Sequence, residues 1–408
     1  MERVVPDTLS PTPAAPKYGA ALSSLSSSQI AAIRSLPSNK DVKPPVIQER
    51  RPVANFISDE YWRSECTAIF RNKPISIAPS AAIPEPGSVL AQDGYGIPLL
   101  LTRDKAGKVH IFLNACTHKG AMLLSEPDVK KWSTVSCPFH AWTYGLDGRL
   151  IGVPRGETLC DFDKKERPLT ELPSHEAGGL IWGILNPKAE PDFALLSDQV
   201  NEDLEHLGLT SWSKYGYRRF ELKANWKLVM EPFLEGYHVQ RLHINSIGPQ
   251  GLDFFDDIVP KVERFGPHIR QISGRGKYTP GLLEDPAVNI RNVVTIVYNL
   301  FPNTVIITSP YYISVMIIMP TGTGTTNVDY YMLTESPPDN PKASELYAKS
   351  FAVIQDVFGN EDFAASETCQ RGLETGAIPD VIYTGMEEAI PRFYEGIEAV
   401  MSGELTSA

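Results

Sequence analysis

The sequence predicts an α+β protein with two unlike parts, a small all-β domain and a larger domain that combines an antiparallel sheet with helices. Two observations lead to this fold class. Between residues 75 and 186, short apolar runs alternate with turn signals such as DGYG and LDGR, as they do in all-β domains. From residue 293 on, four runs rich in β-branched and aromatic residues precede several helical segments. A chain of 408 residues is long enough for two domains.

The first half divides into an arm and the all-β domain. Residues 1–54 are rich in Pro, Ser and Ala and predict an extended arm with a short helix near residues 24–36. A second helix is expected from Ser58, which can cap it, to about residue 70. We place the all-β domain within residues 55–190 and the larger domain within residues 191–408. A helix is expected near residues 195–207.

The larger domain opens with a predicted strand over residues 219–228, which leads into a predicted helix over 228–241. Strands are expected at 293–300, 304–308, 313–319 and 327–334. Those between residues 293 and 319 are expected to line an apolar pocket. Pro341 suits the start of a helix and Gly359 its end. Further helices are expected at 361–372 and 386–401.

Composition narrows the functional class. The net charge of −11 argues against a nucleic-acid partner, because phosphates call for a basic surface. The five cysteines are too few and too irregular for a disulfide framework. We expect Cys66, Cys160 and Cys369 to be ordinary buried thiols. No apolar run is long and unbroken enough for a signal peptide or a membrane helix. We therefore expect a soluble, cytoplasmic protein.

Two Cys-His pairs form the first candidate site. Cys116 and His118 lie on one predicted loop, and Cys137 and His140 on another. Such loops can ligate two irons, and exchanging two thiolates for neutral imidazoles raises the potential of a [2Fe–2S] centre. A structural zinc is the alternative, although zinc sites usually pair like with like, as in C-x2-C and H-x3-H.

His238 and His243 form the second candidate site. With a carboxylate, two histidines complete a facial triad that leaves positions open for O2 and water, the arrangement of non-haem Fe(II) oxygenases. The H-x4-H spacing is weak on its own, because many histidine pairs are simply surface or core residues.

A family resemblance joins the two sites. NACTHKGAML (114–123) and SCPFHAWTYGLDGRL (136–150) resemble the cluster loops of Rieske proteins, with Lys119 where Arg is usual. Residues 225–243 resemble the catalytic domain of Rieske non-haem iron oxygenase α subunits, the aromatic-ring-hydroxylating dioxygenase family, with Pro232 where Asn is common. The resemblance spans roughly residues 55–400.

The resemblance implies a fold and two cofactors. The fold is an all-β Rieske domain plus a helix-grip (START-like) catalytic domain with an antiparallel sheet. The cofactors are a [2Fe–2S] Rieske cluster and a mononuclear Fe(II). In the family, the third iron ligand is an Asp on a C-terminal helix, upstream of a Glu and a Gln. The implied ligands are Cys116, His118, Cys137 and His140 for the cluster, and His238, His243 and Asp362 for the iron, with Glu361 as the alternative to Asp362.

The implied activity is O2-dependent hydroxylation or dioxygenation of an aromatic or other apolar small molecule. Mono-oxygenation, with N- or O-demethylation of a quaternary amine or methylated compound, stays open. A Rieske electron carrier without catalysis is an alternative from another class, but it leaves residues 225–243 without a role. The sequence has no G-x-G-x-x-G after a strand and no flavin signature, so we expect electrons from an NAD(P)H-dependent reductase, with or without a ferredoxin.

Glu235, three residues before His238, is the last candidate. The resemblance implies a homotrimer in which the cluster of one chain serves the iron of the next, and Glu235 would join His238 to His140 of that next chain. Most members use Asp here, and Glu is known in members that oxidise quaternary amines. The other interpretation is a solvated helix acid.

Overall fold

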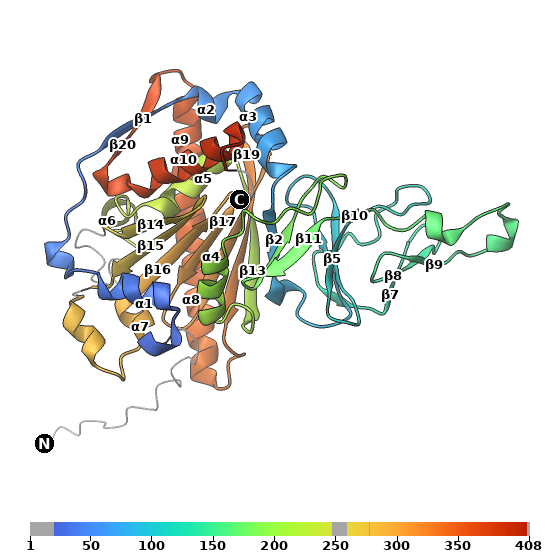
Figure 1. Cartoon of the computed structure of the whole chain (residues 1–408), viewed down its shortest axis with the longest axis horizontal. Coiled ribbons are helices and arrows are strands. Elements are labelled where there is room, and N and C mark those ends of the chain that lie inside the picture. Colours follow the sequence, from blue (N-terminus) through green and yellow to red (C-terminus); the bar gives the residue numbers. More distant parts are fainter. Residues whose placement is uncertain (1–19, 247–258, 277, 406–408) are drawn as a thin grey trace, which may run out of the picture.

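The computed structural model describes residues 20–246, 259–276 and 278–405 of the chain. Its described part forms two bodies that lie side by side (Figure 1). The larger body contains a broad sheet with helices around it, and the smaller one contains β-sheets with short 3-10 helices between some of the strands. The α+β class and the order of its parts are therefore as predicted.

The smaller body, here called the β domain, consists of three antiparallel sheets. The five-stranded sheet has the order β10-β5-β4-β3-β6, and the two others have the orders β11-β12-β2 and β7-β8-β9. The sheet of β7, β8 and β9 lies at the end of the domain farthest from the larger body (Figure 1). The strands are β2 (Ile75–Pro79), β3 (Ser88–Gln92), β4 (Leu99–Arg103), β5 (Val109–Leu113), β6 (Lys130–Lys131), β7 (Thr134–Ser136), β8 (Thr143–Gly145), β9 (Leu150–Gly152), β10 (Glu171–Leu172), β11 (Ser174–Ala177) and β12 (Leu180–Gly183).

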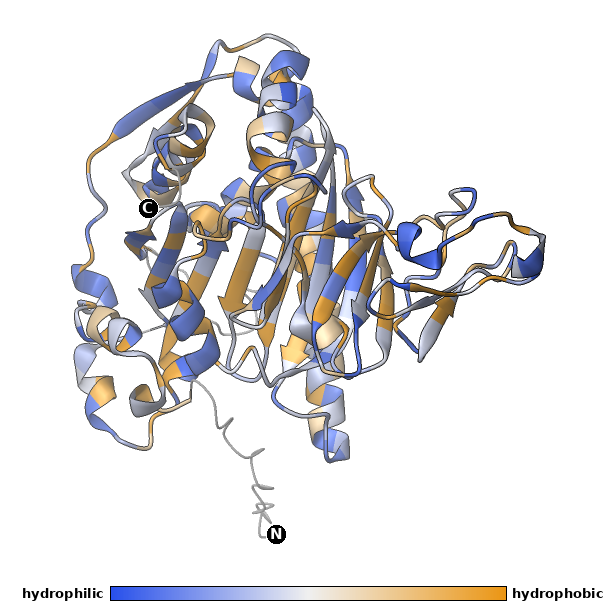
Figure 2. Ribbon diagram, turned by 45° about the vertical axis from the view of Figure 1, so that its right-hand side comes forward, coloured by the Kyte–Doolittle hydropathy of each residue, from blue (hydrophilic) through white to orange (hydrophobic). Residues whose placement is uncertain are grey.

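The larger body contains a seven-stranded antiparallel sheet of order β13-β19-β18-β17-β16-β15-β14. Its central strands are strongly apolar (Figure 2), because they are covered on both faces. All four predicted strands from residue 293 on are confirmed, and residues 323–324 form the turn between the last two. The strands are β13 (Ser213–Leu222), β14 (Lys261–Phe265), β15 (His268–Gly274), β16 (Val294–Leu300), β17 (Thr304–Thr308), β18 (Ile313–Gly322) and β19 (Thr325–Thr334).

The α-helices belong to the larger body or to the arm. Ser58 caps α3 as predicted, since its Oγ accepts a hydrogen bond from Tyr61 N at 3.3 Å. The α-helices are α1 (Ser27–Arg34), α2 (Ala54–Ile57), α3 (Asp59–Glu65), α4 (Asp198–His206), α5 (Trp226–Met230), α6 (Val239–Leu242), α7 (Ile290–Val293), α8 (Pro341–Val357), α9 (Ala364–Leu373) and α10 (Ala389–Ser402). Two π-helical turns, Cys66–Phe70 and Phe358–Phe363, extend α3 and join α8 to α9.

Two expected helices differ in the structure. The helix predicted over residues 228–241 is broken after α5, because Pro232 lacks an N–H and Glu235 adopts an extended conformation. The helix predicted to end at Gly359 instead continues through the π-turn into α9. Gly359 serves packing, since a Cβ there would lie 3.0 Å from the Phe220 ring.

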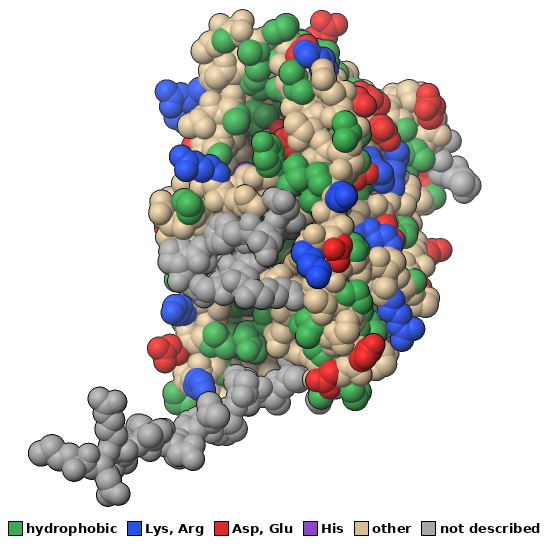
Figure 3. Space-filling model, turned by 90° about the vertical axis from the view of Figure 1, so that its left-hand side faces the viewer, with side chains coloured by type: hydrophobic (Ala, Val, Ile, Leu, Met, Phe, Trp, Pro, Cys, Tyr) green, Lys and Arg blue, Asp and Glu red, His purple; other side chains and the backbone are tan. Residues whose placement is uncertain are grey.

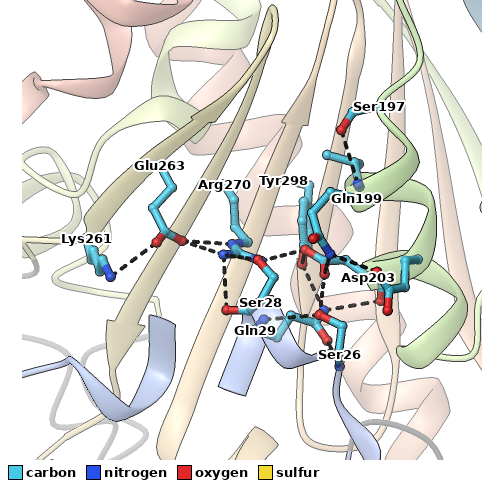
Figure 4. Close-up of polar contacts among 12 residues, drawn as sticks. Ser26, Ser28, Gln29, Ser197, Gln199, Asp203, Lys261, Glu263, Arg270 and Tyr298 are labelled. Carbon is cyan, nitrogen blue, oxygen red and sulfur yellow. Dashed lines mark hydrogen bonds and ion pairs between the residues drawn. The ribbon is translucent and has the colours of Figure 1, made fainter. Parts of the chain in front are cut away.

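Buried polar contacts attach the N-terminal segment to the sheet. β1 (Gln48–Pro52) pairs with β20 (Asp380–Thr384). The buried carboxylate of Asp203 on α4 accepts hydrogen bonds from Arg270 Nη1 at 2.6 Å and from Tyr298 at 2.9 Å, and also from Ser26 at the start of α1 (Figure 4). The arm is therefore part of the larger body, and the limits at residues 54 and 190 stay predictions.

A second polar cluster joins the two bodies. Asp329 on β19 is fully buried, and it accepts hydrogen bonds from Arg219 Nε at 2.6 Å and from Gln92 Nε2 at 2.8 Å. Because Gln92 ends β3 of the β domain and Arg219 lies on β13, these contacts fix how the β domain sits on the sheet.

The charged side chains on the surface are distributed as the net charge of −11 leads us to expect. In the face drawn in Figure 3, the coloured acidic and basic side chains are interspersed rather than gathered in one basic patch. Within the described ranges, no helix is long and apolar enough to cross a membrane. The expectation of buried thiols is wrong for Cys160 and Cys369, which are exposed, while Cys66 is half-buried.

Candidate metal centres

The two Cys-His loops of the β domain have the same backbone geometry. In the first, Cys116 N donates to Ala121 O and Gly120 N to Cys116 O, each at 2.8 Å. In the second, Cys137 N donates to Trp142 O at 2.8 Å and Ala141 N to Cys137 O at 2.9 Å. Each loop turns through a residue with positive φ, +78° at Gly120 and +57° at Ala141. The repeated turn presents a thiol and an imidazole twice in similar positions.

The four side chains differ in exposure. Both cysteines are buried in the small core of the β domain, whereas His118 and His140 are exposed. The two imidazole rings lie 4.8 Å apart, and His118 stacks on Trp142 at 4.7 Å. Tyr144 OH lies 3.2 Å from Cys116 Sγ, and burial together with Cys116 raises the pKa of Tyr144 to about 12. The Tyr144 hydroxyl is thus set to donate a hydrogen bond to a thiolate.

Each loop offers one thiol and one imidazole, and such a mixed pair suits a two-iron cluster better than a structural zinc, whose ligands usually come in like pairs. Among the residues that the structure describes, His238, His243 and Asp362 form a second group, whose ligand atoms lie within 4.8 Å of one another.

The second site begins at the break after α5. Glu235 is extended (φ −151°, ψ 166°), and its carboxylate turns back to accept hydrogen bonds from the backbone N–H groups of Tyr237 and His238. Glu235 also accepts the Nδ1 proton of His238 at 2.5 Å. Its side chain is only 10% exposed, so Glu235 is not a solvated helix acid. The short α6 then separates His238 from His243.

The π-turn between α8 and α9 supplies the acidic side chains. Glu361 accepts the Nδ1 proton of His243 at 2.5 Å and a hydrogen bond from Ser246 at 2.7 Å. Asp362 Oδ1 lies 3.4 Å from His238 Nε2 and 3.3 Å from His243 Nε2. A π-turn often marks a functional site, because it shifts side chains away from their α-helical positions. Here it aims two neighbouring carboxylates at different atoms of His243.

These contacts fit a metal ion. With a metal ion bound, Nδ1 of each neutral ring would donate to a glutamate, and the Nε2 lone pairs of both rings would face the ion beside Asp362. Asp362 Oδ1 is buried and makes no hydrogen bond to any residue that the structure describes. Burial alone would lower the pKa of His238, but Asp362 and Glu235 raise it to about 10. The pKa of His243 is raised in the same way, against the effect of burial. The site therefore concentrates negative charge that a cation would balance.

A cavity of about 470 Å³ opens beside His238, His243 and Asp362. One wall is a face of the sheet, where Val297 and Ile307 contribute side chains, and the opposite wall is α8, with Val353 one turn from Val357. The expectation that strands between residues 293 and 319 line a largely apolar pocket is confirmed. Such walls exclude water and hold an apolar group next to the candidate iron site.

Comparison with known proteins agrees with this geometry. The family model described as the Rieske [2Fe-2S] domain matches residues 73–163, and that described as the ring hydroxylating alpha subunit (catalytic domain) matches residues 209–403. The carnitine monooxygenase oxygenase subunit of Acinetobacter pittii is 28% identical over 222 residues, 52% of this chain but only 57% of that protein. The chloroplastic choline monooxygenase of Spinacia oleracea is 26% identical over 360 residues, 86% of this chain and 78% of that protein.

A similar fold occurs in solved structures. A quaternary ammonium Rieske monooxygenase in complex with L-carnitine superposes with a TM-score of 0.70 at 21% identity, covering 88% of this chain and 96% of that one. A Rieske domain followed by a ring-hydroxylating catalytic domain defines the class of Rieske-type oxygenase α subunits. This chain belongs to that family, as the sequence motifs predicted.

The sequence does not reveal two hydrogen-bond contacts of the candidate ligands. The hydroxyl of Tyr144 on Cys116 and the hydrogen bond from His243 to Glu361 depend on how loops and helices pack. Asp362 and Glu361 were both candidates for the third ligand, and the structure places Asp362 between the two Nε2 atoms. The roles of all these residues as ligands stay predictions.

Proposed function

We propose that this protein is the terminal oxygenase component of a Rieske-type oxygenase system, which inserts oxygen from O2 into a small organic molecule. The observation that supports this best is the presence, in one chain, of paired Cys-His loops and a separate His-His-Asp group beside a cavity. A carrier that only transfers electrons would have no use for the second group or the cavity.

In this proposal, Cys116, His118, Cys137 and His140 hold the [2Fe–2S] cluster, and His238, His243 and Asp362 hold the iron. The iron supplies the binding and reduction of O2 when electrons arrive from the cluster. The protein's own part is to keep the protons on Nδ1 of both histidines through Glu235 and Glu361, and to position the substrate in a cavity shielded from water.

A quaternary amine or another methylated compound is the second candidate substrate class, beside an aromatic or other apolar molecule. Two observations favour it: Glu235 stands where Asp is usual in the family, and relatives named as carnitine and choline monooxygenases match this chain. The reaction would then be a mono-oxygenation, with loss of a methyl group or hydroxylation beside the nitrogen.

Electrons would come from an NAD(P)H-dependent reductase, with or without a ferredoxin, and the working assembly would be a homotrimer. The solved structure of a quaternary ammonium Rieske monooxygenase of similar fold gives insights into inter-subunit electron transfer in that protein. The exposed His118 and His140 support a route that leaves the β domain through its surface.

The test begins with metal content. The proposal expects about three irons per chain, two in a cluster and one alone, and an anisotropic signal in electron paramagnetic resonance (EPR) on reduction. Substrates are then screened by mass spectrometry with a surrogate reductase. Two irons per chain and no O2 uptake with any substrate would instead identify an electron carrier. Steady NADH-driven turnover by the purified chain alone would contradict the need for a reductase.

A further inference from the structure

The described residues that line the cavity include two carboxylates and two cations. Both carboxylates, Glu235 and Asp362, face the histidines of the candidate iron site. The cations are Arg275, which directly follows β15, and Lys349 on α8. A metal ion at the histidines would add further positive charge. With a metal ion bound, the described lining therefore favours a ligand that brings negative charge.

Arg275 lies on the sheet side of the cavity. Its backbone N–H donates to Val293 O at 2.8 Å, and its Nη1 lies 3.4 Å from the hydroxyl of Thr295, which also lines the cavity. Burial lowers the pKa of Arg275, and the Tyr312 hydroxyl opposes that shift. A guanidinium withdrawn from water in this way binds anions more strongly than an exposed one, and its planar fork matches a carboxylate.

A second arginine, Arg291, holds the backbone of the same wall by hydrogen bonds. Arg291 is 2% exposed and donates to the carbonyls of Ser309 and Tyr312, both of which line the cavity. Its buried Nη1 makes no hydrogen bond within the described part of the chain. Burial lowers the pKa of Arg291 to about 9, with Glu335 opposing this and Arg275 adding to it. Arg291 is buried and the neighbouring Arg275 is half-buried, and both positive charges would attract an anion in the cavity.

We propose that the substrate carries a carboxylate and that Arg275 binds it, while the apolar part of the substrate lies between the sheet and α8 with its reacting carbon toward His238. This inference rests on the proposed function and names the substrate class of the same site. If Arg275 binds a carboxylate, the substrate is an acid, either an aromatic acid or a trimethylammonio acid. Neutral arenes and amines without an acid group are then not the expected substrates.

The test measures binding and does not need turnover. Isothermal titration calorimetry is run without reductase, using benzoate, phenylacetate, glycine betaine and γ-butyrobetaine, each beside its primary amide. The amide keeps the shape of the acid but removes its charge. At least one acid is expected to bind ten or more times more tightly than its amide, since a hydrogen bond between two charged groups is stronger than one to a neutral amide. Arg275→Met should remove this difference without weakening the amide, and Arg275→Lys should keep part of it.

Two further variants serve as controls. Arg264→Gln removes the same charge from β14, where Arg264 pairs with Glu395 at 2.9 Å and does not line the cavity, and it should leave the preference unchanged. Lys349→Gln, at an exposed position of the opposite wall, should weaken the acid two- to threefold. The inference is overturned if no acid binds more tightly than its amide, or if the preference survives in Arg275→Met. Failure of the proposed function would show separately, in iron content and O2 uptake.

Discussion

The two candidate metal centres are built in opposite ways. The Cys-His loops lie within residues 116–140 of one small domain and leave both imidazoles at the surface. The other centre takes His238, His243 and Asp362 from two distant parts of the chain and buries them beside a cavity. The comparison teaches that a cluster site can be encoded by local loop geometry, whereas this candidate iron site depends on how a broken helix and a π-turn pack together.

The difference also suits two different tasks. Electron transfer slows as the distance between redox centres grows. Exposed imidazoles keep this distance short for a redox partner that binds to the β domain. A buried triad beside an apolar cavity keeps water from the place where O2 and substrate would meet. Each variant below is expected to affect one centre and spare the other, except Glu235→Ala, which tests the connection between the two centres.

The largest effect is expected from Cys137→Ser. The serine cannot replace a thiolate ligand, so the red-brown colour, the EPR signal of the reduced cluster and all turnover should be lost. Cys160→Ser, which alters an exposed cysteine of the same domain, should keep all three. Retention of the EPR signal by Cys137→Ser would refute the ligand assignment.

Asp362→Ala and Glu361→Gln form a matched pair at the other centre. Asp362→Ala should abolish iron binding and turnover while the cluster spectrum stays intact, because it removes the oxygen that faces both Nε2 atoms. Glu361→Gln should lower iron affinity only about 10–100-fold, as expected when a hydrogen-bond partner of a ligand is lost. Metal analysis and oxygen uptake measure both effects. The reverse order would make Glu361 the third ligand.

Glu235→Ala tests the connection between the two centres. Both metal centres and the trimer should remain, but transfer of an electron from cluster to iron should nearly stop, because His238 and His140 of the next chain would lose their shared acceptor. Single-turnover stopped-flow measures reoxidation of the reduced cluster after substrate and O2 are added. Glu221→Gln, an exposed acid on β13, should reoxidise at the normal rate. A normal rate in Glu235→Ala would show that no such bridge exists.

The sequence predicts the first centre almost completely and the second one in part. Loop spacing is enough to find Cys116 and Cys137, and β-branched runs are enough to find the strands that line the cavity. The amino-acid sequence alone does not decide between Glu361 and Asp362 as the third ligand, because the π-turn changes the direction of each side chain. Arg275 was missed for a related reason: a single arginine in a turn becomes part of a site only when the turn faces a cavity.

The smallest expected effect is that of Tyr144→Phe on the cluster. The ring is fully buried in the core of the β domain, so Phe should keep the packing and remove only the hydroxyl near Cys116 Sγ and Thr117 N. A hydrogen bond to a thiolate stabilises the reduced, more negative cluster, so its loss should lower the reduction potential. If the bond is worth ~1 kcal/mol, the shift is about 40 mV, since a tenfold change in equilibrium corresponds to ~59 mV for one electron. A redox titration followed by circular dichroism measures it. Tyr95→Phe, which removes a buried hydroxyl from the other core, should destabilise the protein without moving the potential. An equal shift in both variants would mean that general loosening of the fold, rather than the bond to Cys116, sets the potential.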